Sequence, residues 1–202
     1  MNSTNYEYRD IPETQKKRSH KKIIITATVL SIIAISVICT VFVIGKEKEI
    51  IYYDNLENAA YKMIDGAANA ESAGNLITDV WYNAIMNEYD DDTDKFTLKD
   101  GQFVDDFNDA LENLFADEAF LENIYEIRDN QDEVLYLMKQ LKSPPAKYKE
   151  AYSVLKEYYG NYLSMTNMVI SPSGSFQSFS DDLTQADKAT ASSFDKIKLY
   201  LN

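Results

Sequence analysis

The sequence predicts an all-α protein in which an N-terminal transmembrane helix precedes an antiparallel four-helix-bundle-like extracytoplasmic domain. Three observations support this fold class. Residues 23–44 form an apolar run of 22 residues without a charge. Beyond this run, apolar side chains recur at alternating steps of three and four, which is the spacing of packed helices. Only three prolines follow the run, and no long alternating strand pattern appears there.

The apolar run predicts a retained membrane anchor. As a helix, Ile23 to Ile44 would be about 33 Å long, close to the ~30 Å hydrocarbon core of a bilayer. A cleaved signal peptide is the alternative, but its apolar region has about 7–15 residues and ends at a small-x-small site. Cys39 does not complete a lipoprotein signal, because Ile38 stands where that signal needs a small residue. We therefore expect Ile23 to Ile44 to contact the lipid bilayer.

The charges that flank the run predict its orientation. Residues 1–22 carry six lysines and arginines against three acidic residues, and only Lys46 and Lys48 follow the run closely. This bias favours a cytoplasmic N-terminus. The predicted organisation is a disordered basic cytoplasmic tail at 1–22, a single transmembrane helix at 23–44 and an extracellular helical bundle at 45–202. The predicted location is the cell membrane.

The first helix of the bundle is predicted between Tyr53 and Ala84, where a heptad seam persists over four repeats. This seam is typical of coiled-coil packing. The acidic run at 90–94 ends the helix. A second helical stretch begins near Asp100 and changes its apolar register around 116–118, so it is either one kinked helix or two helices end to end.

Two further helices complete the predicted bundle. The second stretch closes at Lys142, and the motif "SPP" at 143–145 offers an N-cap serine with proline at the first helical position. The third helix starts there. The turn sequence "SPSGS" at 171–175 leads into the last helix, which runs almost to Asn202. Short loops between four amphipathic segments favour an antiparallel bundle.

The predicted helices differ in the bulk of their seams. Small residues fill residues 65–74 of the first helix ("DGAANAESAG"), a segment called here the waist. The third helix has large residues in its seam: Tyr148, Tyr152, Tyr159 and Tyr162. Because close packing sets large side chains against small ones, we expect these two faces to meet.

Composition excludes several classes of function for residues 45–202. This part has 30 acidic and 14 basic side chains, a net charge of −16, which repels nucleic acid and anionic lipid. A basic partner is compatible with it, and so is a merely soluble surface. The chain's only histidine, His20, and its only cysteine, Cys39, lie outside this part, which excludes the usual zinc sites, a catalytic triad and a thiol nucleophile. The sequence therefore predicts no enzyme and no cofactor.

The acidic run contains a weak candidate for a cation site. Asp90, Asp92 and Asp94 match the opening of a calcium loop. Lys95 stands where such a loop needs glycine, and Gly101 occupies the position of its final bidentate glutamate. A solvated loop that caps the next helix is the competing interpretation.

Four other residues are candidate contacts for a ligand or partner: Glu71, Trp81, Tyr159 and Tyr162. Tyrosine suits surfaces that are half apolar and half hydrogen-bonding, although its heptad spacing here is typical of a core. Glu71 lies within the small waist, where it either points into a cavity or belongs to a solvated flank.

Three stretches resemble uncharacterised single-pass membrane-anchored helical-bundle proteins of low-GC Gram-positive bacteria. They are "AANAESAGNLITDVWYNAI" at 67–85, "LMKQLKSPPAKYKEAY" at 137–152 and "SPSGSFQSFSDDL" at 171–183. The resemblance implies no known activity. The bundle also looks like the periplasmic sensor half of chemotaxis receptors, but it lacks their second membrane helix and signalling domain.

Two functions from different classes follow. The first is a non-enzymatic interaction module that binds an envelope or membrane protein, and the second is a sensor-like domain that binds a small molecule or a cation. A fully packed apolar waist favours the first, whereas a polar cavity beside Glu71 and Tyr159 favours the second. A purely structural role is the third interpretation.

Overall fold

The structure is a computed structural model that describes the backbone of residues 13–201 and the side chains of residues 35–37, 40 and 43–201. The chain forms two compact units, Met1–Ile50 and Ile51–Asn202. The long helix α1 (Glu13–Met86) contributes residues to both units.

The prediction of a transmembrane helix at 23–44 is wrong. These residues belong to α1, which begins at Glu13. Within the part of the chain that the structure describes, no helix has the length and the sustained apolar character that crossing a bilayer requires. The predicted bilayer contact of Ile23 to Ile44 and the predicted location in a cell membrane are therefore left without support. Residues 13–22 of the predicted tail are helical, and residues 1–12 lie outside the described part.

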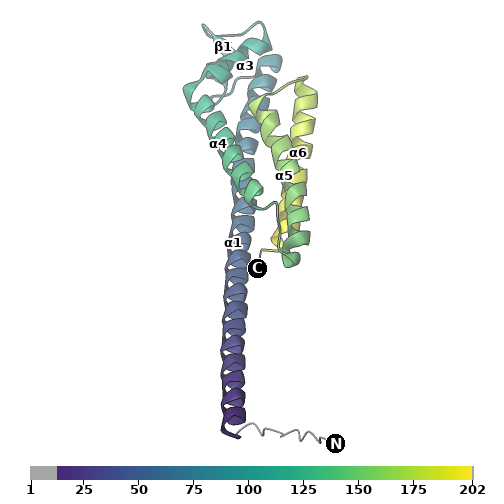
Figure 1. Cartoon of the computed structure of the whole chain (residues 1–202). Helices are drawn as coiled ribbons and strands as arrows, with labels where there is room; N and C mark the ends of the chain where they lie inside the picture. Colours follow the sequence, from purple (N-terminus) through teal and green to yellow (C-terminus); the bar gives the residue numbers. More distant parts are fainter. Residues whose placement is uncertain (1–12, 202) are drawn as a thin grey trace, which may run out of the picture. The chain divides into compact units, whose positions relative to one another are not determined.

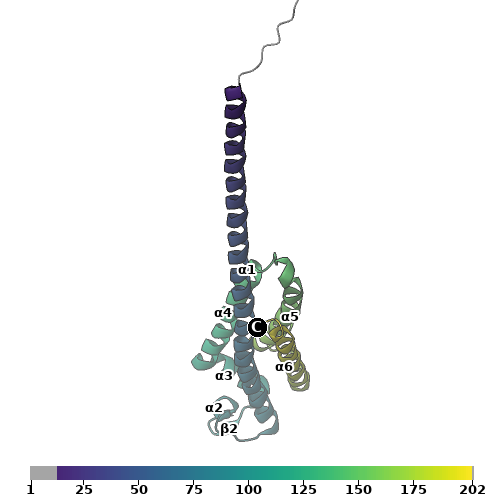
Figure 2. The ribbon, with the colours of Figure 1, turned by 90° about the horizontal axis from the view of Figure 1, so that it is seen from below.

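The second unit is a helical bundle (Figure 1). Its four long segments are α1 from Ile51 onward, α4 (Glu118–Gln140), α5 (Lys149–Ile170) and α6 (Phe176–Lys198). Four short elements complete it: α2 (Asp94–Thr97), β1 (Leu98–Lys99), β2 (Gln102–Phe103) and α3 (Phe107–Ala116), while a 3-10 turn, η1 (Ala146–Tyr148), precedes α5. Figures 1 and 2 both show α5 and α6 side by side along the second half of α1. The all-α class and the bundle-like architecture are confirmed.

Helix caps explain where the elements begin. The predicted register change around 116–118 is a break between two helices, because the Asp117 side chain caps α4 by accepting a hydrogen bond from Phe120 N at 3.1 Å. Ser175 and Ser178 form a reciprocal capping box at the start of α6. The predicted start of the third helix at 143–145 is wrong, since the 3-10 turn intervenes and α5 begins only at Lys149.

A β-hairpin in the second unit was missing from the predicted elements. Leu98 pairs with Phe103 and Lys99 with Gln102 in antiparallel register. Asp100 and Gly101 connect the strands with φ angles of 53° and 79°, which is the backbone of a type I′ turn. The Asp-Gly dipeptide between apolar residues is the sequence signal that identifies such a turn.

The waist packs against α5 as predicted. A Cβ atom added to Gly66 would lie 3.1 Å from Tyr162 Cε2, and one added to Gly74 would lie 3.2 Å from Val169 Cγ2. Ala67 shares a buried cluster with Tyr158 and Tyr162. Small residues on α1 thus let Tyr162 of the predicted seam approach closely, whereas the other three seam tyrosines are only half-buried. The nearest neighbours of Gly66 and Gly74 are Asn130 of α4 and Leu183 of α6, so the waist also faces these two helices.

Candidate functional site

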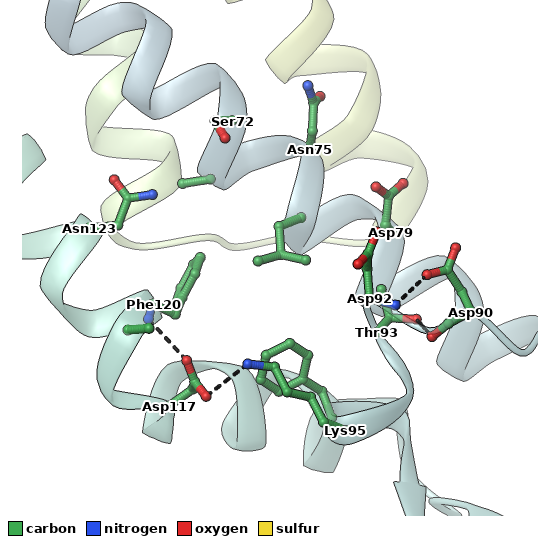
Figure 3. Close-up of a pocket in the computed structure, with 14 residues that line it drawn as sticks. Ser72, Asn75, Asp79, Asp90, Asp92, Thr93, Lys95, Asp117, Phe120 and Asn123 are labelled. Carbon is green, nitrogen blue, oxygen red and sulfur yellow. Dashed lines mark hydrogen bonds and ion pairs between the residues drawn. The ribbon is translucent and has the colours of Figure 1, made fainter.

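A polar pocket of about 520 Å³ lies within the second unit, between α1, the loop that follows it and the start of α4. Its polar lining residues are Ser72, Asn75, Asp79, Asp90, Asp92, Thr93, Lys95, Asp117 and Asn123. Its apolar lining residues are Ala73, Leu76, Phe96, Ala119 and Phe120. Figure 3 shows Asn75 and Asp79 projecting from one helix and Asp117, Phe120 and Asn123 from another.

One carboxylate of the pocket, that of Asp117, accepts hydrogen bonds from other groups of the protein on both of its oxygens. Asp117 Oδ2 accepts a hydrogen bond from Lys95 Nζ at 3.0 Å, and its other oxygen caps α4 (Figure 3). The Lys95 ammonium group and the Phe120 N–H both favour the charged form, so they lower the pKa of Asp117 below its usual value. Lys95 is the pocket's only basic lining residue, and this contact occupies it.

A second carboxylate lacks such compensation. Burial raises the pKa of Asp79, and the nearby charge of Asp90 raises it further. Among the described residues, no lysine or arginine forms an ion pair with Asp79, Asp90 or Asp92. The pocket therefore concentrates negative charge that the described part of the chain leaves unneutralised.

Two of the three carboxylates of the weak cation candidate, those of Asp90 and Asp94, accept hydrogen bonds within their own loop. Asp90 Oδ1 accepts from Asp92 N at 2.8 Å, and Asp94 Oδ1 accepts from Asp90 N at 2.9 Å. In the range that the structure covers, no group of three or more histidine, cysteine or acidic side chains is arranged to hold a metal ion. These contacts favour the interpretation of a structured loop that leads into α2.

Large apolar side chains are exposed around the pocket end of the bundle. Five of them belong to the end of α1 or to the segments after it: Tyr82, Ile85, Met86, Tyr89 and Phe107. Met86 is 57% exposed and Tyr89 is 66% exposed. Such side chains gathered at one end of a folded unit mark an interaction surface more often than singly scattered ones do.

Aromatic contacts connect several of these residues to the core. Trp81 is buried, and its ring lies 6.2 Å from that of Phe107 and 6.5 Å from that of Phe176. The ring of Tyr82 also lies 5.9 Å from that of Phe176, and the ring of Tyr89 lies 4.7 Å from that of Phe103. Among the exposed aromatic residues, Trp81 thus contacts Phe107 directly, and Trp81 itself is buried away from a partner.

The other candidate contacts do not converge on one site. Glu71 is exposed and does not line the pocket. Tyr159 is half-buried and stacks on Tyr162 with ring centroids 6.4 Å apart. Tyr162 is fully buried, and its hydroxyl donates to Asn130 Oδ1 at 2.6 Å. Tyr162 is therefore a core residue, and Tyr159 packs against the core at its edge.

Of the residues that build the pocket, sequence reasoning singled out Asp90 and Asp92 and missed the others, among them Asn75, Asp79 and Asp117. Asn75 and Asp79 are four residues apart and Asp79 and Tyr82 are three apart, so they share one helix face opposite the predicted seam. A polar residue opposite a seam is ordinarily solvated, and nothing local indicates that α4 will lie across from it. The stronger signal is the charge of residues 79–118, here called the acidic end, which has 13 acidic and two basic side chains.

No family model, no curated protein and no solved structure matches this chain. The resemblance to membrane-anchored bundle proteins of Gram-positive bacteria therefore stays a prediction. The class that the geometry defines is an all-α bundle with a polar pocket and exposed apolar side chains at one end.

Proposed function

We propose that the bundle is a helical interaction module that binds a partner protein at its acidic end. The observation that supports this proposal is the exposure of Tyr82, Ile85, Met86, Tyr89 and Phe107 around one end of the bundle. Protein interfaces are enriched in tyrosine, phenylalanine and methionine at their centres, with polar groups around them. The acidic end offers that combination.

The packing of the waist supports the same proposal. A cavity beside Glu71 and Tyr159 was the feature expected of a ligand-binding core. The waist instead presents fully buried Ala70 and nearly buried Ala67, with large side chains in the same clusters, and only its last part, at Ser72 and Ala73, lines the polar pocket. A core packed in this way leaves recognition to the surface.

Site-specific photo-crosslinking in the cells that make the protein tests this proposal. The full chain carries a photo-crosslinking phenylalanine analogue in place of Tyr89, and a matched chain carries it in place of Tyr125, an exposed tyrosine of α4. We expect one adduct of defined mass from position 89, none from position 125, and loss of the adduct when Met86→Ser is added. Equal labelling from both positions, or none from position 89, would overturn the proposal.

The alternative of small-molecule or cation binding stays a prediction. The polar pocket beside Asp79 is the feature that it would use, and the described core offers it no support beside Glu71. The absence of enzymatic activity likewise stays a prediction.

A further inference from the structure

The negative charge of the second unit is concentrated at one end. The acidic end, residues 79–118, has 13 acidic and two basic side chains, a net charge of −11. The other residues of the unit, 51–78 and 119–202, have 15 acidic and 10 basic side chains, a net charge of only −5. A partner that approaches this end meets a field of one sign, which attracts cations and repels anions.

The pocket is placed to receive a single cationic group. Asp79, Asp90 and Asp92 line it, and in the described part of the chain none of the three has a lysine or arginine partner. Asn75 and Asn123 add amide oxygens that can accept hydrogen bonds. Its apolar walls, which include Leu76, Phe96 and Phe120, suit the methylene stem of a long basic side chain.

The pocket is continuous with the exposed apolar side chains along α1. Asn75, Asp79, Tyr82 and Met86 follow one another at steps of four, three and four, so they form one face of the helix, and all four are exposed. This face runs from the pocket toward the end of α1, beyond which the ring of Tyr89 lies 4.7 Å from that of the hairpin residue Phe103, tilted by 56°. A ligand that fills the pocket can therefore also cover the rings of Tyr82 and Tyr89.

We propose that this surface binds a basic segment of a partner protein, with one lysine or arginine side chain entering the pocket beside Asp79. The inference rests on the proposed function and names the chemistry of its partner. Charge complementarity selects the occupant, because an anionic segment, a nucleic acid or an anionic lipid surface would be repelled by the acidic end. The exposed tyrosine rings add cation–π contacts for further basic side chains of the same segment.

Binding of synthetic peptides to the full chain tests the inference. One labelled peptide alternates lysine and leucine, and a matched peptide alternates glutamate and leucine. We expect fluorescence anisotropy to show saturable binding of the lysine peptide that weakens with added salt, and no binding of the glutamate peptide. Failure of the lysine peptide to bind at a concentration of about 1 mM would overturn the inference.

Two variants with the same change in charge show whether the pocket is involved. Asp79→Asn removes the uncompensated carboxylate, whereas Asp129→Asn removes an exposed carboxylate of α4 that does not line the pocket. We expect Asp79→Asn to weaken binding of the lysine peptide by roughly tenfold or more, the size of one charge-assisted hydrogen bond. Asp129→Asn should change it by less than about twofold, the effect of an exposed charge. Equal effects would show attraction to net charge alone and would overturn the pocket's role.

Small cations and the crosslinking experiment separate the remaining outcomes. Free arginine should compete with the lysine peptide only weakly, and full competition at equal concentration would assign the pocket to a small molecule and overturn the inference. If crosslinking at position 89 captures a partner while the two Asp variants behave alike, the proposed function stands and the basic-segment inference fails. If position 89 captures nothing, the proposed function fails with it.

Discussion

The waist lies within α1, whereas the acidic end combines the last residues of α1 with the loop, α2, hairpin and α3 that follow, and the two regions differ in how their side chains are partnered. At the waist, Gly66 lets Asn130 and Tyr162 approach so closely that no side chain fits between them. Asn130 is paired there, because it accepts from the Tyr162 hydroxyl and donates to Lys62 O at 3.1 Å, whereas the Tyr158 hydroxyl is buried without a partner in the described part of the chain. At the acidic end, apolar rings are exposed, and among the pocket's carboxylates Asp117 has a lysine partner whereas Asp79 has none in the described part of the chain.

This difference indicates which region holds the bundle together and which is available for binding. Paired polar groups and close packing contribute stability, because an unpaired buried group costs about 1–3 kcal/mol. Exposed rings and uncompensated carboxylates contribute little to stability or reduce it. A folded unit retains such features where another molecule supplies the missing contacts. Substitutions in the two regions should therefore separate stability from binding.

The largest effect on stability is expected when a side chain is added to the waist at Gly66. Gly66→Leu places a Cβ atom 2.0 Å from Asn130 Oδ1 and 3.1 Å from Tyr162 Cε2, so α1 and α4 must separate or Asn130 must give up its hydrogen bonds. We expect a loss of about 3 kcal/mol in the free energy of unfolding, measured by urea denaturation of the full chain.

Gly160→Leu is the matched control for the waist variant. Gly160 lies inside α5, and an added Cβ atom would meet nothing within 4 Å. Replacement of a helical glycine at an open position should stabilise the protein by about 0.5–1 kcal/mol. Equal losses for the two variants would contradict the close approach of α1 and α4 at Gly66.

A smaller effect should separate two buried tyrosines of the same helix. The Tyr162 hydroxyl donates to Asn130, whereas the Tyr158 hydroxyl is buried without a partner in the described part of the chain. Tyr162→Phe should therefore cost about 1–2 kcal/mol, since it leaves Asn130 Oδ1 unpaired. Tyr158→Phe should be neutral or slightly stabilising, because it removes an unpaired polar atom.

Thermal and urea unfolding of the two phenylalanine variants compare them directly. Both variants remove one oxygen atom from a fully buried ring, so the loss of packing is the same. A larger loss for Tyr158→Phe than for Tyr162→Phe would show that the polar network of the waist is assigned to the wrong tyrosine.

The two regions also differ in how far they can be predicted from the sequence. The waist is predictable, because small residues at heptad spacing and bulky tyrosines elsewhere allow few alternative pairings. Even there, the sequence does not identify Tyr158 as a core residue, since it lies one step off the predicted seam at Tyr159. The break at Asp117 is also predictable, because the apolar register changes there.

The pocket could not be predicted, because its residues are far apart in the chain. Asp79 and Asp117 come together only because a loop, α2, a hairpin and α3 return the chain to α1. The register of that return depends on the hairpin turn at Asp100-Gly101, where the sequence analysis instead places the start of a helical stretch. The apolar run at 23–44 is the reverse case, because the sequence predicts a feature that the structure lacks. Hydropathy alone predicts a bilayer span there, and the described helix does not support one.

Two carboxylates of the acidic end, those of Asp79 and Asp117, should affect the stability of the protein with opposite dependence on pH. Burial and Asp90 raise the pKa of Asp79 in the folded state, so its ionised form is destabilising and stability is lost as the pH rises above the ordinary value of 3.8. Asp79→Asn should therefore stabilise the protein at neutral pH, by about 0.5 kcal/mol after allowance for solvent screening. This gain should vanish below about pH 4.

Asp117→Asn should show the opposite sign. Lys95 and the Phe120 N–H lower the pKa of Asp117, so its ionised form is stabilising above the ordinary value of 3.8, and this stability is lost as the pH falls through the folded-state pKa. Asparagine keeps the N-cap of α4, so the variant isolates the charge. Unfolding curves at neutral and acidic pH should show a destabilised variant whose deficit shrinks in acid. If both variants change the free energy of unfolding in the same direction, the two carboxylates do not differ as described, with Asp117 compensated and Asp79 uncompensated.

The smallest effect on stability is expected at the exposed apolar surface. Met86 is the last residue of α1 and is 57% exposed, so Met86→Ser should change the free energy of unfolding by no more than about 0.5 kcal/mol. Ile77→Ala in the same helix should cost about 2–5 kcal/mol, because Ile77 is fully buried. The same Met86→Ser chain should lose the crosslink from position 89. If Met86→Ser instead destabilises the bundle by more than 1 kcal/mol, Met86 is part of the core, and the contrast between a packed waist and an available acidic end fails at that residue.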